Sequence, residues 1–559
     1  MIPMDNFSDV LVVGGGAAGL YAAIAATEIK GIRKVTLLTP DELGTGGCSK
    51  KTHGINAALN EKDSWESHER DTLEGGGWIN NPALVKIMCQ RIPDRIKELE
   101  SWGVRFAKSG ERYDVGTYGG SSFSRSIHWY DITGLEIVNE LVKRVILKGC
   151  FVHEGRWVVE LLIHNGRCFG VLALNKLGKR FEEYRARSVI FATGGGACVY
   201  PISSISSDKI ATGLVLGFRA EAPMVDMEMV QFHPTGLLLP GSQGNGSLLE
   251  EEMRAKGGIL LNSLCHRYMY DYDDRGELAT RDIVARSSYL EIIKGRGTKN
   301  KGVIFDISRI DKNILSTRLP KTVKRLRSWG IDLMAVNEIE ISPTAHFLMG
   351  GLVIDERCET GIKGLFACGE DAGGIHGANR LGGNGVAEAL VFGHLCGVSA
   401  ANAALGSDAN PPASLLPKPL TFYAIDNAQM VEIDNKIKQI MWNGVGVVRW
   451  QAQLMDAWNK ICEIRDILKP TMQELAPKEI SNYGKNFWGG RILLNKLDIA
   501  TIITKAAITR KHSIGAHYIA DEESEGEPFY NVYVRWGTDH LPKTQIVHLP
   551  ENRRTTIST

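Results

Sequence analysis

The sequence predicts an α/β fold built on a Rossmann-like dinucleotide-binding unit. Its first segment, DVLVVGGGAAGLYAAIAA at residues 9–26, has the pattern of a buried strand, a glycine turn and an alanine-rich helix. A second apolar strand, KVTLLT, follows at residues 34–39. Two later apolar runs break into glycines, VIFATGGG at 189–196 and GLFACGEDAGG at 364–374. Because these strands are spread over the chain, we expect one nucleotide domain interrupted by an insertion, which favours FAD over NAD.

The glycines of the first segment have the GxGxxG spacing of a dinucleotide-binding turn. Gly14 permits the tight turn, Gly16 lets the backbone approach a pyrophosphate, and Gly19 lets the helix pack on the strand. The helix that begins at Ala17 and Ala18 would direct unpaired N–H groups at the phosphates. We therefore predict that these five residues contact the cofactor.

Thr39 ends the second strand, where such folds usually carry an acidic residue for the adenosine ribose. A hydroxyl can make that hydrogen bond more weakly, and an ordinary turn is the alternative. Further candidate cofactor contacts lie in the glycine-rich segments and in the loop GCSKKTHGINAAL at 47–59. They are Ser49, Thr193, Gly194, Gly195, Glu370, Gly383, Asn384 and Gly385.

The loop at 47–59 brings a thiol, two lysines and an imidazole together, which suits a metal site, a nucleophile or a loop laid along an anionic cofactor. The 10 cysteines of the chain are scattered singly, without CxxC or close Cys/His spacing. We therefore expect no metal, no zinc or iron–sulfur ligation within this chain, and no disulfide framework. Of the three explanations for the loop, the metal site is therefore excluded, while a nucleophile and a cofactor contact remain.

Size and composition exclude several classes of protein. A chain of 559 residues is too long for one core, so three or four domains are expected. The net charge of +1 gives no reason to propose a nucleic-acid partner. The apolar run at 10–26 is short for a membrane span and contains the glycine cluster, and no signal peptide precedes it. We expect a cytoplasmic chain without a direct membrane span, associated with a membrane only through a partner.

Four motifs occur in an order that resembles the flavoprotein subunits of succinate dehydrogenase and fumarate reductase, with L-aspartate oxidase as a near relative. They are QFHPTG at 231–236, TRDIVARS at 280–287, SPTAHFLMGGL at 342–352 and HGANRLGGN at 376–384. DSWESHERDT at 63–72 and HSIGAHY at 512–518 extend the likeness to nearly the whole chain.

The resemblance implies four domains. They are an FAD-binding domain at 1–233 and 346–415, an α+β capping domain at 234–345, a helical domain at 416–510 and a small C-terminal domain at 511–559. The helical assignment has its own support, because apolar residues recur at three- and four-residue spacing over 430–441 and 448–468.

The resemblance also bears on how FAD is held. In the respiratory members a histidine in this loop bonds covalently to the flavin, and its position falls at about Gly47 here. His53 lies six residues later, where the family has glycine. We therefore predict non-covalent FAD, with a thioether to Cys48 as the alternative.

The chemistry that the resemblance implies is the interconversion of C=C and CH–CH beside a carboxylate, with hydride passing through flavin N5. Arg281 matches the proton donor, and Glu251 with Arg254 matches the relay that resupplies it. Arginine is normally a permanent cation, so this role requires a dry site with a carboxylate beside it.

Further residues match positions that hold the substrate's carboxylates: His233, His346 and Arg380. Each has an alternative, since the HPTG segment could be a turn with a core histidine and NRLGG could neutralise flavin. These alternatives are less favoured inside four ordered motifs.

Several positions depart from the family pattern. Tyr118 stands where aspartate oxidases have a glutamate for the substrate amine, which disfavours an amino-acid substrate. Glu250 replaces a threonine that helps to bind one carboxylate, and an anion there costs free energy unless it is paired or protonated. Either Glu250 points away, or the substrate is not a plain C4 dicarboxylate. Thr212 replaces an aspartate near the flavin, and Ile514 replaces an arginine.

Three functions compete on this basis. The first is an FAD-dependent fumarate reductase or succinate dehydrogenase type of enzyme that acts on a small carboxylic acid and exchanges electrons with an iron–sulfur subunit. The second is a stand-alone oxidase of the L-aspartate oxidase kind. The third is a flavin electron-transfer subunit without substrate chemistry, which retention of Arg281, Glu251 and Arg254 argues against.

Overall fold

The structure is a computed structural model that describes residues 7–550, with gaps at 46, 178–179, 206–208, 408–411, 413–421, 472, 476–479 and 524–527. Its centre is a 7-stranded sheet in the order β8-β2-β1-β11-β10-β9, with β18 also paired to β11. These strands are β1 (Phe7–Val13), β2 (Val35–Leu38), β8 (Phe151–His153), β9 (Arg156–His164), β10 (Arg167–Asn175), β11 (Arg180–Phe191) and β18 (Leu365–Ala367). The strands around β1 run parallel, as the Rossmann-like prediction requires.

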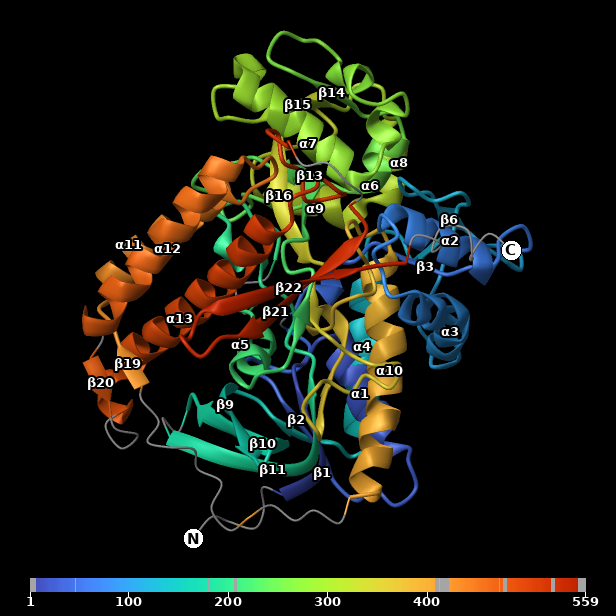
Figure 1. Ribbon diagram of the computed structural model, residues 1–559. Helices are drawn as coiled ribbons and strands as arrows, with labels where there is room; N and C mark the ends of the chain where they lie inside the picture. Colours follow the sequence, from blue (N-terminus) through green and yellow to red (C-terminus); the bar gives the residue numbers. More distant parts are fainter. Residues whose placement is uncertain are drawn as a thin grey trace.

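Two helices pack face to face beside this sheet (Figure 1). They are α1 (Ala17–Thr27) and α10 (Asn384–Leu405). The helices touch closely because Gly393 and Gly397 of α10 lie against the backbone of Ala18 and Ala22, where a Cβ atom would collide. α10 is long and apolar enough to cross a membrane, but 72% of its apolar window is buried inside the protein, as in a core helix.

Further helices and short strands surround the amino-terminal half. The helices are α2 (Trp65–Gly75), α3 (Pro82–Ser101), α4 (Thr133–Leu147) and α5 (Thr212–Arg219). The strands are β3 (Gly54–Asn56), β4 (Lys108–Ser109), β5 (Arg112–Tyr113), β6 (Val115–Gly116) and β7 (Ser126–His128). β3, β7 and β6 form a small sheet that carries the loop at 47–59 toward the centre of the molecule.

The segment predicted as a capping domain forms the end of the molecule drawn in green in Figure 1, with its own apolar core. Its sheet has the order β13-β16-β15-β14. The elements are β13 (Val230–Leu237), β14 (Ile259–Leu261), β15 (Val303–Asp306), β16 (Glu338–Leu348), α6 (Glu251–Ala255), α7 (Arg281–Glu291), α8 (Lys312–Arg318) and α9 (Pro320–Ser328). Strands β13 and β16 extend through the predicted boundaries at 233/234 and 345/346, with a register shift between His233 and Gly236, so both strands belong to the two regions at once.

Three helices follow, in the region predicted to be helical. They are α11 (Asn427–Gly444), α12 (Gln451–Thr471) and α13 (Ile480–Thr509), with a strand pair of β19 (Phe422–Ala424) and β20 (Gln473–Leu475). The predicted boundary at 415/416 lies outside the described residues. The carboxyl-terminal hairpin of β21 (Tyr530–Trp536) and β22 (Pro542–His548) returns to the first half, where it pairs with β12 (Met224–Val225), which in turn pairs with β17 (Gly351–Leu352).

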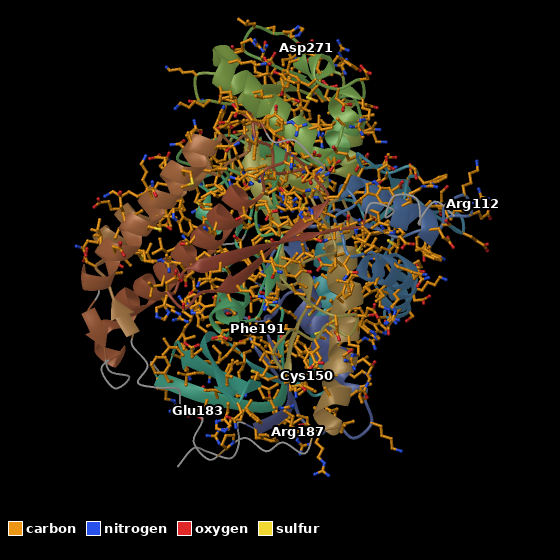
Figure 2. The ribbon with its side chains drawn as sticks, in the orientation of Figure 1. Arg112, Cys150, Glu183, Arg187, Phe191 and Asp271 are labelled. Carbon is orange, nitrogen blue, oxygen red and sulfur yellow. The ribbon has the colours of Figure 1, made fainter. Side chains whose placement is uncertain are left out.

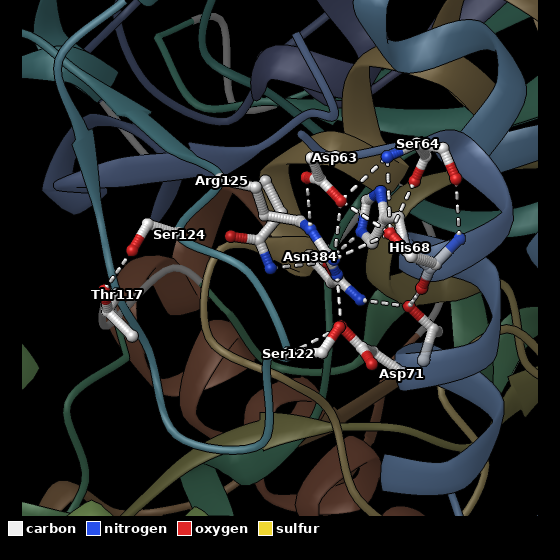
Figure 3. A network of polar contacts seen from close by, with 12 residues as sticks. Asp63, Ser64, His68, Asp71, Thr117, Ser122, Ser124, Arg125 and Asn384 are labelled. Carbon is white, nitrogen blue, oxygen red and sulfur yellow. Dashed lines mark hydrogen bonds and ion pairs between the residues drawn. The ribbon is translucent and has the colours of Figure 1, made fainter. Parts of the chain in front are cut away.

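A buried polar network ties α2 to the start of α10 (Figure 3). Arg125 is 1% exposed and donates to Asp63 at 2.9 Å and to Asp71 at 2.6 Å. On the same side of α2, His68 contacts the Asn384 amide oxygen at 2.9 Å. Because each charge in the network has a partner, the network positions the amino-terminal end of α10.

Replacing Arg125 with methionine should destabilise the protein strongly, because Asp63 and Asp71 would remain buried without their counter-charge. We expect a loss of roughly 3–5 kcal/mol, measured as a lower urea midpoint by circular dichroism. Arg112 makes an exposed ion pair with Glu61 and projects at the periphery in Figure 2, so Arg112→Met is the matched control and should change stability by less than about 1 kcal/mol. Equal midpoints for both variants would contradict the role of the buried network.

Candidate active site

A cavity of about 470 Å³ lies where the FAD-binding region meets the capping region. Its wall combines the loop at 47–59, the start of α1, strands β13 and β16, helices α6 and α7, and the start of α10. A second, narrow pocket of about 60 Å³ extends from Gly14 along Thr39 and Thr212. Cavities of this combined shape suit an elongated cofactor with its reactive end beside a small substrate.

The glycine turn after β1 fits a dinucleotide. Gly14 has a φ of +123°, and a side chain on Gly14 or Gly19 would collide with the backbone carbonyl of Ala192 or Gly14, respectively. Ala17 is the first residue of α1, and its backbone N–H lies 3.3 Å from the Ser49 hydroxyl. The residue before the helix, Gly16, has no side chain that could cap it. This cradle would hold the diphosphate of FAD at the amino-terminal end of α1.

Some residues predicted to contact the cofactor also form hydrogen bonds or close contacts within the protein. The Thr193 hydroxyl donates to Asp371 at 3.0 Å and accepts from the Gly213 N–H at 2.8 Å. Gly194 has a φ of +87°, and a Cβ atom on Gly195 would collide with Glu370. Burial raises the pKa of Glu370 to about 7, although the Leu348 N–H donates to it. These residues shape the floor of the nucleotide site through their backbone.

The start of α10 forms another part of the cavity wall. Gly383, with a φ of +84°, precedes the helix, and both Gly383 and Gly385 line the cavity. The Asn384 amide group is occupied by Asn56, His68 and Thr72. Asn384 therefore fixes the helix start, and its backbone N–H also donates within the protein, to the Leu381 carbonyl at 3.3 Å.

The predicted relay residues meet in the structure. Both Nε and Nη2 of Arg281 bind one carboxylate oxygen of Glu251, at 2.8 and 2.7 Å. The other oxygen accepts from the Gly119 N–H at 3.1 Å and lies 3.5 Å from Arg254. Burial raises the pKa of Glu251, but Arg281 and Arg254 outweigh it and hold the pKa below its usual range. All three side chains are buried, as a proton-donating arginine requires.

Gln231 links the relay to Arg380. Its amide oxygen accepts from Arg281 at 3.2 Å and from Arg380 at 3.0 Å. Its amide nitrogen donates to the Arg380 carbonyl at 2.7 Å. Sequence reasoning missed this residue, although it is the first residue of the QFHPTG motif.

Arg380 has no carboxylate partner among the described residues. Its guanidinium lies 4.4 Å from the centre of the Phe347 ring, and its Nε is buried without a hydrogen-bond partner in the described part of the chain. Burial, followed by the charge of Arg281, lowers the pKa of Arg380 to about 9. A buried cation without a counter-ion favours an anionic ligand at this position.

His233 and His346 lie together, with their ring centres 5.5 Å apart. His346 contacts the Ser204 hydroxyl at 2.8 Å, and His233 contacts Thr235 at 3.3 Å. Burial and the nearby arginines hold the pKa of each imidazole well below its ordinary value. Both histidines are therefore neutral hydrogen-bonding groups at physiological pH.

Glu250 is one of the residues that line the cavity, and its carboxylate is bound by other side chains of the protein. It forms an ion pair with His53 and also accepts from Thr322 at 2.9 Å and from Arg325 at 3.2 Å. The carboxylate is therefore paired, which is the condition under which an anion beside a bound carboxylate is tolerated. The compensated charge also removes the reason to exclude a dicarboxylate.

The other departures from the family pattern lie in different places. Tyr118 is a cavity residue packed against Gly382, and burial raises the pKa of its hydroxyl. Ile514 packs against Gly77, outside the residues that line the cavity. Over the described part of the chain, no group of three or more His, Cys, Asp or Glu side chains could hold a metal ion.

A dinucleotide cradle joined to a cavity lined by arginine, histidine and carboxylate groups defines a flavin-dependent oxidoreductase. The FAD binding domain family matches residues 9–386, and the fumarate reductase flavoprotein C-terminal family matches 434–546. The CoM/CoB fumarate reductase of Methanothermobacter marburgensis has a subunit that is 37% identical, over 92% of this chain and 94% of that protein. L-aspartate oxidase of Synechocystis is 32% identical, over 92% and 94%.

Among solved structures, E. coli quinol fumarate reductase FrdA superimposes with a TM-score of 0.89 at 28% identity, covering 97% of both chains. The chain therefore belongs to the succinate dehydrogenase and fumarate reductase flavoprotein family. It is an FAD-dependent oxidoreductase acting on CH–CH bonds, and the predicted family, fold class and FAD cofactor are confirmed.

Non-covalent attachment of FAD remains a prediction, based on Gly47 at the position of the attaching histidine. Denaturing the purified protein in acid should release all of the yellow colour into the supernatant. The intact mass of the polypeptide should equal the mass calculated from its sequence. A yellow pellet, or a mass increased by one flavin, would contradict the prediction; digestion of such a pellet would test Cys48 as the attachment point.

Proposed function

We propose that this chain is the catalytic flavoprotein of an enzyme that reduces the C=C bond of a small unsaturated acid of the fumarate type, or runs the reverse reaction. The observation that carries the proposal is the buried contact of Arg281 with Glu251, beside an arginine that lacks a counter-charge. When bound, FAD supplies the hydride at N5. The remaining requirements fall on the residues of the cavity.

The first requirement is to hold and polarise the acid. Arg380 offers a buried positive charge to a carboxylate, and the neutral imidazoles of His233 and His346 offer further hydrogen bonds. Carboxylates held in this way draw electron density from the double bond as hydride arrives. Because water is excluded, these electrostatic interactions act at low dielectric and are strong.

The second requirement is a proton for the other carbon. Arg281 would donate it, since its guanidinium is buried and its lost charge could be offset at once through Glu251. Arg254 would resupply the proton through the same carboxylate. Burial is the largest cause that lowers the pKa of Arg254, which makes this guanidinium a better acid than an exposed one.

The third requirement is a route for electrons. The cysteines are scattered singly along the sequence, without the close spacing of cluster ligands, and several relatives are named as flavoprotein subunits of fumarate reductase. We therefore propose that the electron partner is a separate iron–sulfur subunit. Any association with a membrane would come through that complex.

A stand-alone oxidase of the L-aspartate oxidase kind is disfavoured by Tyr118, because a phenol offers no negative charge for a substrate amine. A pure electron-transfer subunit is disfavoured by the intact relay.

Dithionite-reduced protein should be reoxidised by fumarate much faster than by oxygen or by the imine of L-aspartate. Faster reoxidation by the imine or by oxygen would favour the oxidase, and no reoxidation by any of the three would favour the electron-transfer subunit.

Arg281→Lys should lower the kcat for fumarate reduction with a reduced viologen dye by roughly 10²- to 10⁴-fold, the usual contribution of a positioned general acid. Lysine keeps the charge but cannot reach Glu251 with two donors. The flavin absorbance spectrum should stay unchanged, which separates a catalytic defect from unfolding. Arg275 pairs with Asp273 at the surface, so Arg275→Lys is the control and should retain full activity. Near-normal turnover by Arg281→Lys would remove this residue from the proposed role.

A further inference from the structure

Two cavity residues that the proposed chemistry does not use are bound to each other. His53 belongs to the loop before β3, and Glu250 immediately precedes α6 of the capping region. Nδ1 of His53 and a carboxylate oxygen of Glu250 form an ion pair, and both side chains line the cavity that contains Arg281. Each of the two residues departs from the family pattern, and the two side chains that differ are in direct contact.

The carboxylate of Glu250 is fully occupied by the protein. One oxygen faces His53, while the other accepts from Thr322 at 2.9 Å and from Arg325 at 3.2 Å. Burial raises the pKa of Glu250, but His53 and then Arg325 outweigh it, so the pKa lies below its usual range. Glu250 is thus an ionised group that orients His53, and its charge is not directed at a ligand.

The second ring nitrogen of His53 remains for a ligand. Nδ1 is engaged by Glu250, and Nε2 has no hydrogen-bond partner among the residues that the structure describes. The side chain of His53 is 20% exposed and lies on the cavity wall. An imidazole held by a carboxylate at one nitrogen can carry a second proton at the other, where it becomes a charged N–H donor.

The other histidines near the relay cannot serve in this way. His233 and His346 are surrounded by arginines, and their hydrogen-bonding partners are hydroxyl groups of Thr235 and Ser204. Neither is paired with a carboxylate in the described part of the chain. His53 differs because Glu250 can compensate a positive charge on its ring when an anion approaches.

We propose that His53, oriented by Glu250, binds a second anionic oxygen group of the substrate, while Arg380 holds the first. His53 is then a specificity-determining residue, and the preferred ligands are small acids with two anionic groups. The inference rests on the proposed function, because it concerns the same cavity and the same reaction.

The test compares fumarate with its monoamide, fumaramate, in the flavin-loaded enzyme with a reduced viologen dye as electron donor. His53→Gln removes the imidazole and its contact with Glu250 but keeps a polar side chain. It should raise the KM for fumarate roughly 10- to 100-fold, the equivalent of one hydrogen bond to a charged group. It should change kcat, and the KM for fumaramate, less than about threefold.

Two further variants complete the design. Glu250→Gln should also raise the KM for fumarate selectively, by a smaller factor, because His53 loses its orienting charge. His266→Gln is the matched control, since His266 forms a similar 2.8 Å pair with Asp271 at the outer end of the capping region (Figure 2). It should leave both KM values unchanged. The flavin spectrum and flavin content of each variant report whether it has folded.

Several results would overturn the inference. His53→Gln could change the KM of both acids alike, reduce kcat as a structural role beside Glu251 would, or change nothing. A Glu250→Gln variant with the wild-type KM for fumarate would exclude Glu250 as the orienting group. Failure of the proposed function is distinguishable, because it shows as a wild-type enzyme that does not reduce fumarate. In that case, titration of the oxidised flavin spectrum with succinate still tests whether His53→Gln weakens the binding of a diacid.

Discussion

The ion pair between Arg281 and Glu251 is the interaction on which the charge balance of the cavity depends. Burying either charge alone would cost several kcal/mol, so each needs the other and a further donor. Part of that compensation crosses the region boundary, since the Gly119 N–H of the amino-terminal region donates to Glu251. The Gly119 N–H is therefore one contact through which the amino-terminal region stabilises a charge of the capping region.

The same reasoning explains which charges face a ligand. Glu250 and Glu251 are both bound by cationic side chains, so neither repels an acid in the cavity. Arg380 is the exception on the cationic side, because Gln231 and the Phe347 ring satisfy it only partly. An incoming carboxylate would supply the missing negative charge, and this links the electrostatics of the site to the class of substrate.

Much of the fold could be predicted from the sequence because its signals are local. The glycine spacing after β1 reflects collisions that a side chain would cause in that turn, and four ordered motifs identified the family. The contact of His53 with Glu250 could not be predicted, since it joins segments far apart in the chain across two regions. Gln231 was missed for a related reason, because its role appears only when Arg281 and Arg380 converge on it. The roles of Thr193 and Asn384 in holding the backbone also required their partners to be known.

The central claim is that a buried arginine stands ready to protonate a carbon of the bound acid while its carboxylate partner balances the charge. A crystal structure of the FAD-loaded protein with succinate in the cavity tests this claim most directly. We expect a guanidinium nitrogen of Arg281 within about 3.5 Å of a methylene carbon, with Glu251 still bound to it. A succinate placed with Arg281 turned away from both methylene carbons, and with only its carboxylates contacted, would contradict the claim.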